Sequence, residues 1–228
     1  MKKALIILSC VVVAGLAFAT AFLLAYDREQ GVSEKPVLYV YSPQEQRLTV
    51  SVDVDGAIDT AYPAPDALET TDWGTQASWT VTASPDGTLT DASGRTYPSL
   101  FWDGPVGQES PEEGFVVARE DAVPFLEEKL ALLGLTDKEA ADFITYWAPR
   151  IRANEYTFVS FDASSYTAHA RYSFTDEAGA PVKPDTFIRV FMTIRQAEVT
   201  TQVREQAFGP TPQRTGLVAV EWGGTEEQ

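Results

Sequence analysis

The sequence has almost none of the residues on which zinc centres, disulfide frameworks and thiol chemistry depend. Its 228 residues include one cysteine, Cys10, and one histidine, His169. A single cysteine cannot form a disulfide within the chain, so disulfide-dense secreted scaffolds are excluded. The same two counts argue against most zinc sites and against cysteine nucleophiles. We therefore expect no metal and no cofactor, and a fold that is stabilised by packing.

Basic residues are also scarce. The chain has 17 Lys and Arg residues against 33 Asp and Glu residues, which gives a formal net charge of −16. Nucleic acids and anionic lipid surfaces bind cationic protein surfaces, so we expect neither as the main partner. Hydrophobic residues make up 44% of the chain and aromatic residues 11%. That composition is sufficient for a substantial core.

One long hydrophobic run lies at the amino terminus. Residues Ala4–Tyr26 are uncharged and follow Lys2 and Lys3. A helix of this length spans roughly 34 Å, enough to cross a hydrocarbon core of about 30 Å. Positive charge before the run keeps that end cytoplasmic, so we expect a single-pass anchor in the cell membrane with the bulk of the chain outside. The polar residues 27–36 are expected to form a stalk.

Two other fates of this run stay open. Ala17-Phe18-Ala19 has the small-x-small pattern of a signal-peptide cleavage site, and cleavage near Ala19 would give a secreted protein. Ser9-Cys10 resembles a lipoprotein signal, but it leaves only Ala4–Leu8 as an apolar region, which is shorter than the roughly 7–15 residues expected. The length of the whole run favours the anchor.

The order of the predicted elements is typical of an α+β fold. The first half contains short strands of alternating hydrophobicity, such as Leu48–Val54, which predict an antiparallel, sandwich-like meander. Residues 121–148 have the pattern of a helical hairpin that packs on the sheet. Further strands are predicted after it at Tyr156–Phe161, His169–Phe174, Thr186–Ile194, Glu198–Ala207 and Leu217–Trp222.

We expect these elements to form one extracytoplasmic domain at residues 37–224. A sub-boundary is predicted near 104–114, an acidic stretch with two prolines. Residues 63–72 read as a loop, and residues 225–228 as an acidic tail.

The helical hairpin carries the clearest local signals. Asp121 is expected to cap the first helix, and Gly134 to end it in a left-handed conformation. Thr136 and Glu139 have the spacing of a capping box at the start of the second helix. Pro149 is expected to stop that helix, because proline lacks the amide hydrogen that the helix needs.

Candidate site residues come from carboxylate chemistry. The sequence has no G-x-S-x-G elbow, phosphate loop or H-E-x-x-H motif. A glycosidase needs only two acids and aromatic walls for the sugar. Asp103 follows Trp102, and Glu221 precedes Trp222, so we take the acids as candidate catalytic residues and the tryptophans as candidate binding residues. The alternative is that both tryptophans are core and both acids are surface groups. His169 is interpreted as a structural or surface residue.

Several segments together resemble a family of uncharacterised bacterial extracytoplasmic proteins. The resemblance covers roughly Lys35–Gly224, although Val40 and Ser42 stand where leucine and proline would be expected. The family has no established activity, so the resemblance implies one cell-surface domain and no particular chemistry. The segments that carry it are Lys35–Tyr41, Ser99–Gly104, Gly114–Val117, Phe125–Leu130 and Val220–Gly224.

Three functions stay open. We expect first a membrane-anchored binding or interaction domain whose partner is a cell-envelope glycan or a protein, since the poverty of catalytic residues argues against an enzyme. The second is a carboxylate-dependent glycan or cell-wall hydrolase, which requires Asp103 and Glu221 to share a cleft. The third is a structural surface protein without a ligand site.

Overall fold

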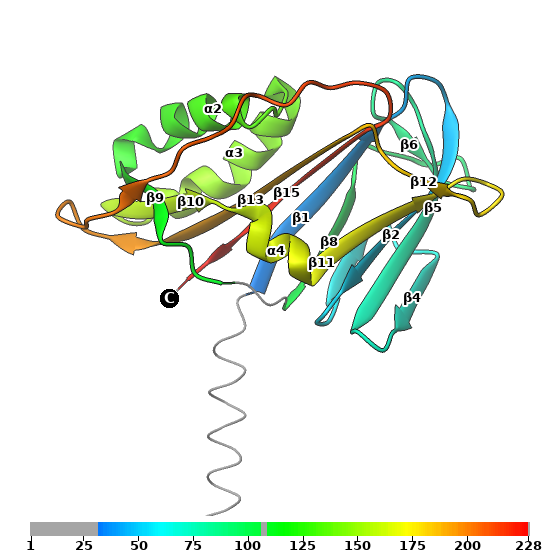
Figure 1. The fold of residues 1–228 in the computed structure, drawn as a ribbon, viewed down its shortest axis with the longest axis horizontal. Coiled ribbons are helices and arrows are strands. Elements are labelled where there is room, and N and C mark those ends of the chain that lie inside the picture. The colour runs from blue at the N-terminus through cyan, green and yellow to red at the C-terminus, as the bar shows by residue number, and fades with distance from the viewer. Residues whose placement is uncertain (1–31, 106–108, 228) are drawn as a thin grey trace, which may run out of the picture.

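The computed structural model describes residues 32–105 and 109–227, which form three layers. Two helices cover one face of a central sheet, and a second sheet covers its other face (Figure 1). The predicted α+β class is confirmed. The predicted membrane anchor, residues 4–26, lies outside the described residues. None of the helices within the described ranges has both the length and the apolar composition that crossing a bilayer takes.

The central layer, here sheet I, is an eight-stranded mixed sheet. Its two middle strands β13 and β15 are parallel, whereas β1 runs antiparallel to β15 and β10 antiparallel to β13. The strand order is β14 (Arg204–Glu205), β9 (Glu113–Ala118), β10 (Tyr156–Phe161), β13 (Thr186–Ala197), β15 (Val218–Glu226), β1 (Val32–Tyr41), β8 (Leu100–Pro105) and β3 (Thr60–Tyr62).

The second layer, sheet II, is antiparallel and lies on the face of sheet I away from the helices. Besides the main path, β4 (Ala67–Thr70) pairs with one edge of β5. The strand order is β12 (Pro181–Val182), β11 (Ala170–Thr175), β2 (Gln46–Val54), β5 (Thr75–Ala83), β6 (Leu89–Thr90) and β7 (Thr96–Tyr97).

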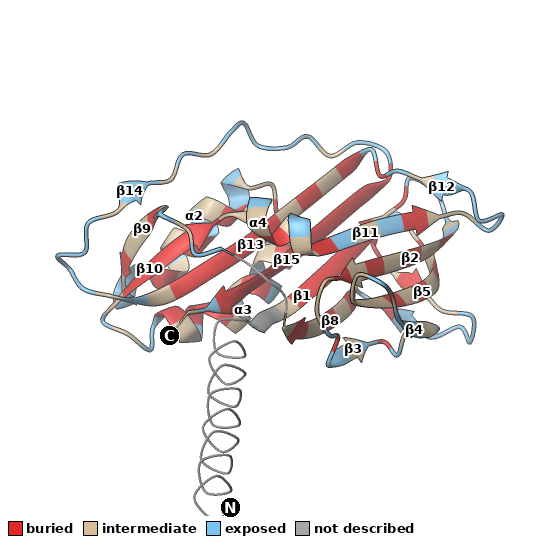
Figure 2. Ribbon diagram, turned by 60° about the horizontal axis from the view of Figure 1, so that its bottom comes forward, coloured by how far each residue is buried: buried red, intermediate tan, exposed pale blue. Residues whose placement is uncertain are grey.

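Alternation along the strands divides the core into two parts. On β15, Ala219 belongs to the cluster between the two sheets, whereas Val218, Val220 and Trp222 belong to the cluster under the helices. Because both faces of this strand are covered, it is buried along almost its whole length, unlike the edge strands (Figure 2). Strand β15 therefore lies in the interior, with one face against the helices and the other against sheet II.

The helices α2 (Ala122–Leu132) and α3 (Asp137–Ile151) form the predicted hairpin. Gly134 has a φ of 91°, and its amide and that of Leu135 donate to the carbonyls of Ala131 and Leu130, so the predicted glycine stop is confirmed. The capping box is also present: the Thr136 side chain accepts from the Glu139 amide, and the Glu139 carboxylate accepts from the Thr136 amide.

Two predictions on these helices are wrong. Asp121 makes no capping hydrogen bond, because it ends a 3₁₀ turn, η1 (Arg119–Asp121), that leads directly into α2. Pro149 lies inside α3, which continues to Ile151. A proline removes one intrahelical hydrogen bond, and α3 nevertheless continues for two residues beyond it. The Arg150 side chain donates to the carbonyl of Tyr146, and the Arg152 amide donates to that of Ala148.

Other boundaries also differ from those predicted. Strand β1 begins at Val32, inside the predicted stalk, and β15 reaches Glu226, inside the predicted acidic tail. The predicted loop 63–72 contains β4. The segment Glu198–Ala207 pairs only as the two-residue β14, so the predicted strand there is wrong. His169 ends a short helix, α4 (Ala163–His169), and β11 begins one residue later.

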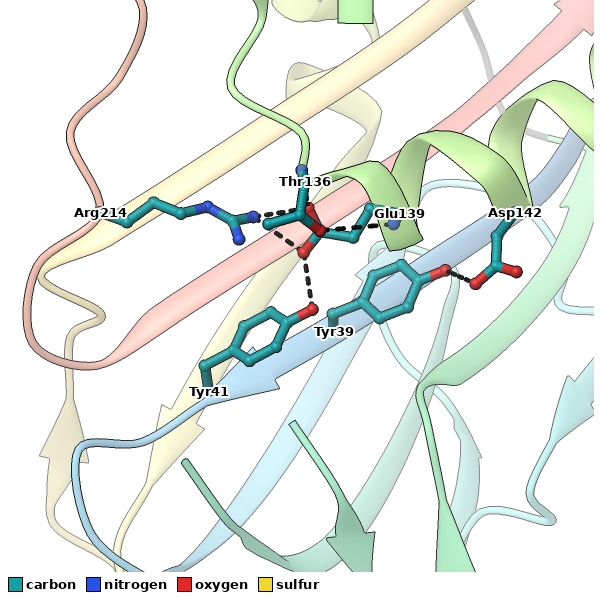
Figure 3. A network of polar contacts seen from close by, with 6 residues as sticks. All are labelled: Tyr39, Tyr41, Thr136, Glu139, Asp142 and Arg214. Carbon is teal, nitrogen blue, oxygen red and sulfur yellow. Dashed lines mark hydrogen bonds and ion pairs between the residues drawn. The ribbon is translucent and has the colours of Figure 1, made fainter. Parts of the chain in front are cut away.

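A buried carboxylate fastens the connection before β15 to the helices (Figure 3). Glu139 is fully buried and accepts hydrogen bonds from the Arg214 guanidinium at 2.7 and 2.8 Å and from the Tyr41 hydroxyl at 2.7 Å. The neighbouring Tyr39 hydroxyl donates to Asp142. Burial and these carboxylates raise the pKa values of Tyr39 and Tyr41. One side chain thus joins α3, β1 and the loop at Arg214.

Candidate functional site

The structure places Glu221 in the layer between the two sheets, where its side chain is 1% exposed. One carboxylate oxygen accepts from Arg189 Nε at 2.6 Å, and the other accepts from the Tyr166 hydroxyl at 2.8 Å. Arg189 also donates from Nη1 to the carbonyl of Ala170. The ion pair therefore connects β15 and β13 of sheet I with α4 and with the start of β11.

Two more side chains complete this group. The hydroxyl of Tyr172 accepts from Trp102 Nε1 at 2.8 Å. Burial, and then the nearby charge of Glu221, raises the pKa values of Tyr166 and Tyr172 well above their usual range. We call these five residues, Glu221, Arg189, Tyr166, Tyr172 and Trp102, the Glu221 cluster. Glu221 and Trp102 are each 1% exposed, so the cluster joins secondary-structure elements from within the core.

The two candidate catalytic acids lie on opposite faces of sheet I. Trp102 is 1% exposed and packs between the sheets, so the alternation of β8 directs Asp103 to the other face, away from Glu221. Trp222 is fully buried beneath α3, with its ring 5.3 Å from that of Phe143. Trp102 and Glu221 both belong to the Glu221 cluster, whereas Asp103 lies on the other face of the sheet. A two-carboxylate glycosidase requires its two acids to share a cleft, and Asp103 and Glu221 do not.

The single histidine pairs with an acid at the far end of sheet II. His169 Nδ1 is hydrogen bonded to Asp55 Oδ2, and the Asp55 amide donates to the His169 carbonyl. A pocket of about 510 Å³ adjoins His169 and is lined by carboxylates and hydroxyls that include Asp162 and Ser164. Asp162 already accepts from the amide and hydroxyl of Ser164, as the N-cap of α4. Among the described residues no group of three or more side chains has the arrangement of a metal site.

A different opening lies where sheet II is interrupted. On one edge of β5, the strand β4 pairs with Thr75–Ser78 and β6 pairs with Thr82–Ala83. Between them, Trp79–Val81 has no neighbouring strand of the described chain on this side. The Thr80 amide instead donates to Asp66 Oδ2 at 2.6 Å. In an antiparallel strand the amide and carbonyl of one residue point to the same side, so the Thr80 carbonyl also lies on this open edge.

Aromatic side chains wall this opening, which we call the edge cleft. It has a volume of about 390 Å³, and its lining includes Tyr62, Asp66, Thr80, Asp91, Arg95 and Tyr97. Tyr62, from the edge strand β3 of sheet I, is 56% exposed, and its ring meets that of Tyr97 edge to face at 5.7 Å. The edge cleft therefore lies where the margins of the two sheets meet, and it presents an exposed aromatic ring.

The polar groups of the edge cleft are fixed before any ligand arrives. Hydrogen bonds from Ser93, Arg95 and Tyr97 lower the pKa of Asp91 to about 2, so this carboxylate is charged at any physiological pH. The Arg95 guanidinium lies 5.7 Å from the centre of the Tyr97 ring. Trp79 Nε1 donates to the carbonyl of Pro63 at 2.8 Å and holds the loop beneath Tyr62. Acceptors, a cationic donor and an aromatic surface thus surround one cavity.

Sequence reasoning missed these residues. Residues 63–72 read only as a loop and residues 91–94 only as a turn, and Tyr62 stands alone before Pro63. The available signal was a large aromatic residue beside prolines in an otherwise polar loop, where it has little chance of burial.

A comparison with protein-family models, with curated proteins and with solved structures found no match. The resemblance of Lys35–Gly224 to a family of extracytoplasmic proteins therefore stays a prediction.

Proposed function

We propose that this protein is a membrane-anchored extracytoplasmic binding domain that takes neutral cell-envelope glycans in the edge cleft. The observation that carries the proposal is Tyr62, an aromatic side chain that is 56% exposed at the mouth of a cavity of about 390 Å³. Binding sites combine an apolar surface with a few fixed polar groups. A sugar ring offers an apolar C–H face to Tyr62 and hydroxyls to the surrounding donors and acceptors.

Charge favours a neutral ligand. The chain carries a net charge of −16, which repels anionic polymers. Within the edge cleft, Asp66 and Asp91 accept hydrogen bonds, whereas Arg95 donates. Sugar hydroxyls both donate and accept, so they match this mixed lining without requiring a charge of their own.

The test compares glycan binding by the wild-type protein and by Tyr62→Ala. Isothermal titration with β-1,4-linked oligosaccharides of N-acetylglucosamine or glucose should show binding by the wild type and a loss of roughly tenfold or more in the variant. Tyr62→Phe keeps the ring and should retain most of the affinity. Val199→Ala removes a similarly exposed side chain, 68% exposed, beyond the opposite margin of sheet I, and serves as the matched control.

If the wild-type protein binds none of these oligosaccharides, the proposal is wrong, and a structural surface protein is the better interpretation. Equal binding by the wild type and Tyr62→Ala would place the glycan elsewhere.

The membrane anchor is a separate part of the proposal. It rests on the apolar run Ala4–Tyr26, whose length suits a bilayer. We expect the intact chain in the membrane fraction, with an intact mass that includes residues 1–26. A mature protein that begins at Thr20, in the soluble extracytoplasmic fraction, would show instead that the run is a cleaved signal peptide.

A further inference from the structure

The outer face of sheet II carries an ordered set of hydroxyl groups. Three strands that lie side by side, β11, β2 and β5, contribute two residues each (Figure 2). In one cross-strand row Thr49 pairs with Thr175 and with Thr80, and in the next row Ser51 pairs with Ser173 and with Ser78. We call these six residues, Thr49, Thr80, Thr175, Ser51, Ser78 and Ser173, the hydroxyl face.

The pleat of the sheet sets the geometry of the hydroxyl face. On β2, Val50 and Val52 alternate with Thr49 and Ser51 and are fully buried, so the hydroxyl-bearing side chains point outward. Neighbouring strands are about 4.8 Å apart, and alternate residues of one strand are about 6.8 Å apart. Two hydrogen bonds fix the rotamers: Thr49 to Thr80 at 3.1 Å and Ser51 to Ser78 at 2.7 Å. The result is a regular array of hydroxyl groups, four of which are oriented by these hydrogen bonds.

The hydroxyl face is uncharged within a strongly acidic chain. None of its six members is ionisable, although the protein has 33 acidic residues. Charged residues occupy its margins instead: Arg47 is next along β2 on one side, and Asp53 and Arg171 form the next cross-strand row on the other. Exposure to solvent explains why the residues of this face are polar, but it does not explain why these six residues are all uncharged.

A hollow on the hydroxyl face shares the lining residue Thr80 with the edge cleft. It has a volume of about 350 Å³ and is lined by Thr49, Thr80 and Thr175, by Arg47 and by the turn at Asp176–Gly179, so the Arg47–Glu177 ion pair also borders it. The Thr80 side chain faces the hollow, while its amide donates to Asp66 on the open edge of β5. The two openings are therefore adjacent parts of one surface that turns around β5.

We propose that the edge cleft and the hydroxyl face form one extended site for a linear neutral oligosaccharide. One sugar ring occupies the edge cleft at Tyr62, and the following units cross Thr80 and lie on the hydroxyl face towards β11. The inference rests on the proposed glycan binding and adds its substrate class, a chain of several units. An uncharged array of hydroxyls suits such a chain, because sugar hydroxyls can exchange hydrogen bonds with each row.

Isothermal titration of the full-length protein with β-1,4-linked N-acetylglucosamine oligomers of one to six units tests the extended site. Affinity should rise with chain length until the hydroxyl face is covered. The double variant Thr49→Val/Thr175→Val should bind the hexamer roughly tenfold more weakly and the disaccharide as the wild type does. Valine keeps the β-branched shape that a strand favours, so these variants should fold. Thr200→Val/Thr211→Val, at two exposed threonines in the connection before β15, is the matched control.

The outcomes separate the two proposals. Affinity that is independent of chain length, or hexamer binding that the double variant leaves unchanged, would overturn the extended site while glycan binding in the edge cleft stands. No binding of any oligomer by the wild type would overturn both.

Discussion

Replacing Arg189 by leucine should lower the free energy of unfolding by about 3–5 kcal/mol, the cost typical of breaking a buried ion pair by removing one partner. The reason is the position of Glu221, which is 1% exposed and whose carboxylate would keep the hydrogen bond from the Tyr166 hydroxyl but lose its cationic partner. Arg189 is itself only 13% exposed, so water cannot readily replace it. Chemical denaturation with circular dichroism measures the difference.

A second variant separates the ion pair from the packing. Arg189→Leu/Glu221→Leu removes both charges, and with Tyr166→Phe it also removes the hydroxyl that would lose its acceptor. Such replacement of a whole buried group by apolar residues is often close to neutral, so stability should largely return. Arg204→Leu breaks an exposed pair with Glu113 and should cost at most about 1 kcal/mol. An Arg189→Leu protein as stable as the wild type would contradict this account of the Glu221 cluster.

Replacing Glu139 by alanine should lower the free energy of unfolding by about 2–4 kcal/mol. The variant loses the capping box, worth about 1 kcal/mol, and the charged hydrogen bonds from Arg214, worth about 1.5–3 kcal/mol. It also leaves the Tyr41 hydroxyl without its acceptor. Because these partners come from α3, β1 and the loop before β15, hydrogen exchange should become faster in all three segments (Figure 3).

Two comparisons sharpen this prediction. Glu139→Gln preserves the shape of the side chain and a capping acceptor but not the charge, so it should cost less than Glu139→Ala. Lys138→Ala, at the exposed neighbouring position of the same helical turn, should stay within about 0.5 kcal/mol of the wild type. Faster exchange confined to the start of α3 would show that Glu139 acts only as a cap.

Local features of the fold were predictable because their causes lie within a few residues. Gly134 ends α2, and Thr136 with Glu139 starts α3, through contacts that span three to five positions. Strand alternation likewise predicted strands such as β2, but not the parallel pairing of β13 with β15 or the division into two sheets. Pro149 was misjudged because its effect depends on how much helix remains after it, and only two residues do.

Tertiary placement is what the sequence could not supply. Glu221 and Asp103 each adjoin a tryptophan, but pairing of β15, β1 and β8 puts the two acids on opposite faces of one sheet. The pairing register of each strand decides which of its side chains lie on which face of the sheet. A register shift by one residue would move each side chain to the opposite face.

The edge cleft was missed for a related reason. Its walls come from β3 of sheet I and from β5 and β7 of sheet II, and it exists because β4 and β6 leave part of β5 uncovered. No short segment contains that information. Thr80 and Asp66 acquire their significance only from the hydrogen bond that joins them across the gap.

The most direct test of the proposed binding site is an amide NMR titration of the full-length protein with the N-acetylglucosamine hexamer. We predict that the signals of Tyr62, Thr80 and Arg95 shift in fast or intermediate exchange, that those of Thr49 and Thr175 follow, and that the pocket beside His169 is unaffected. Shifts confined to the His169 pocket, or no shift at saturating hexamer, would contradict glycan binding in the edge cleft.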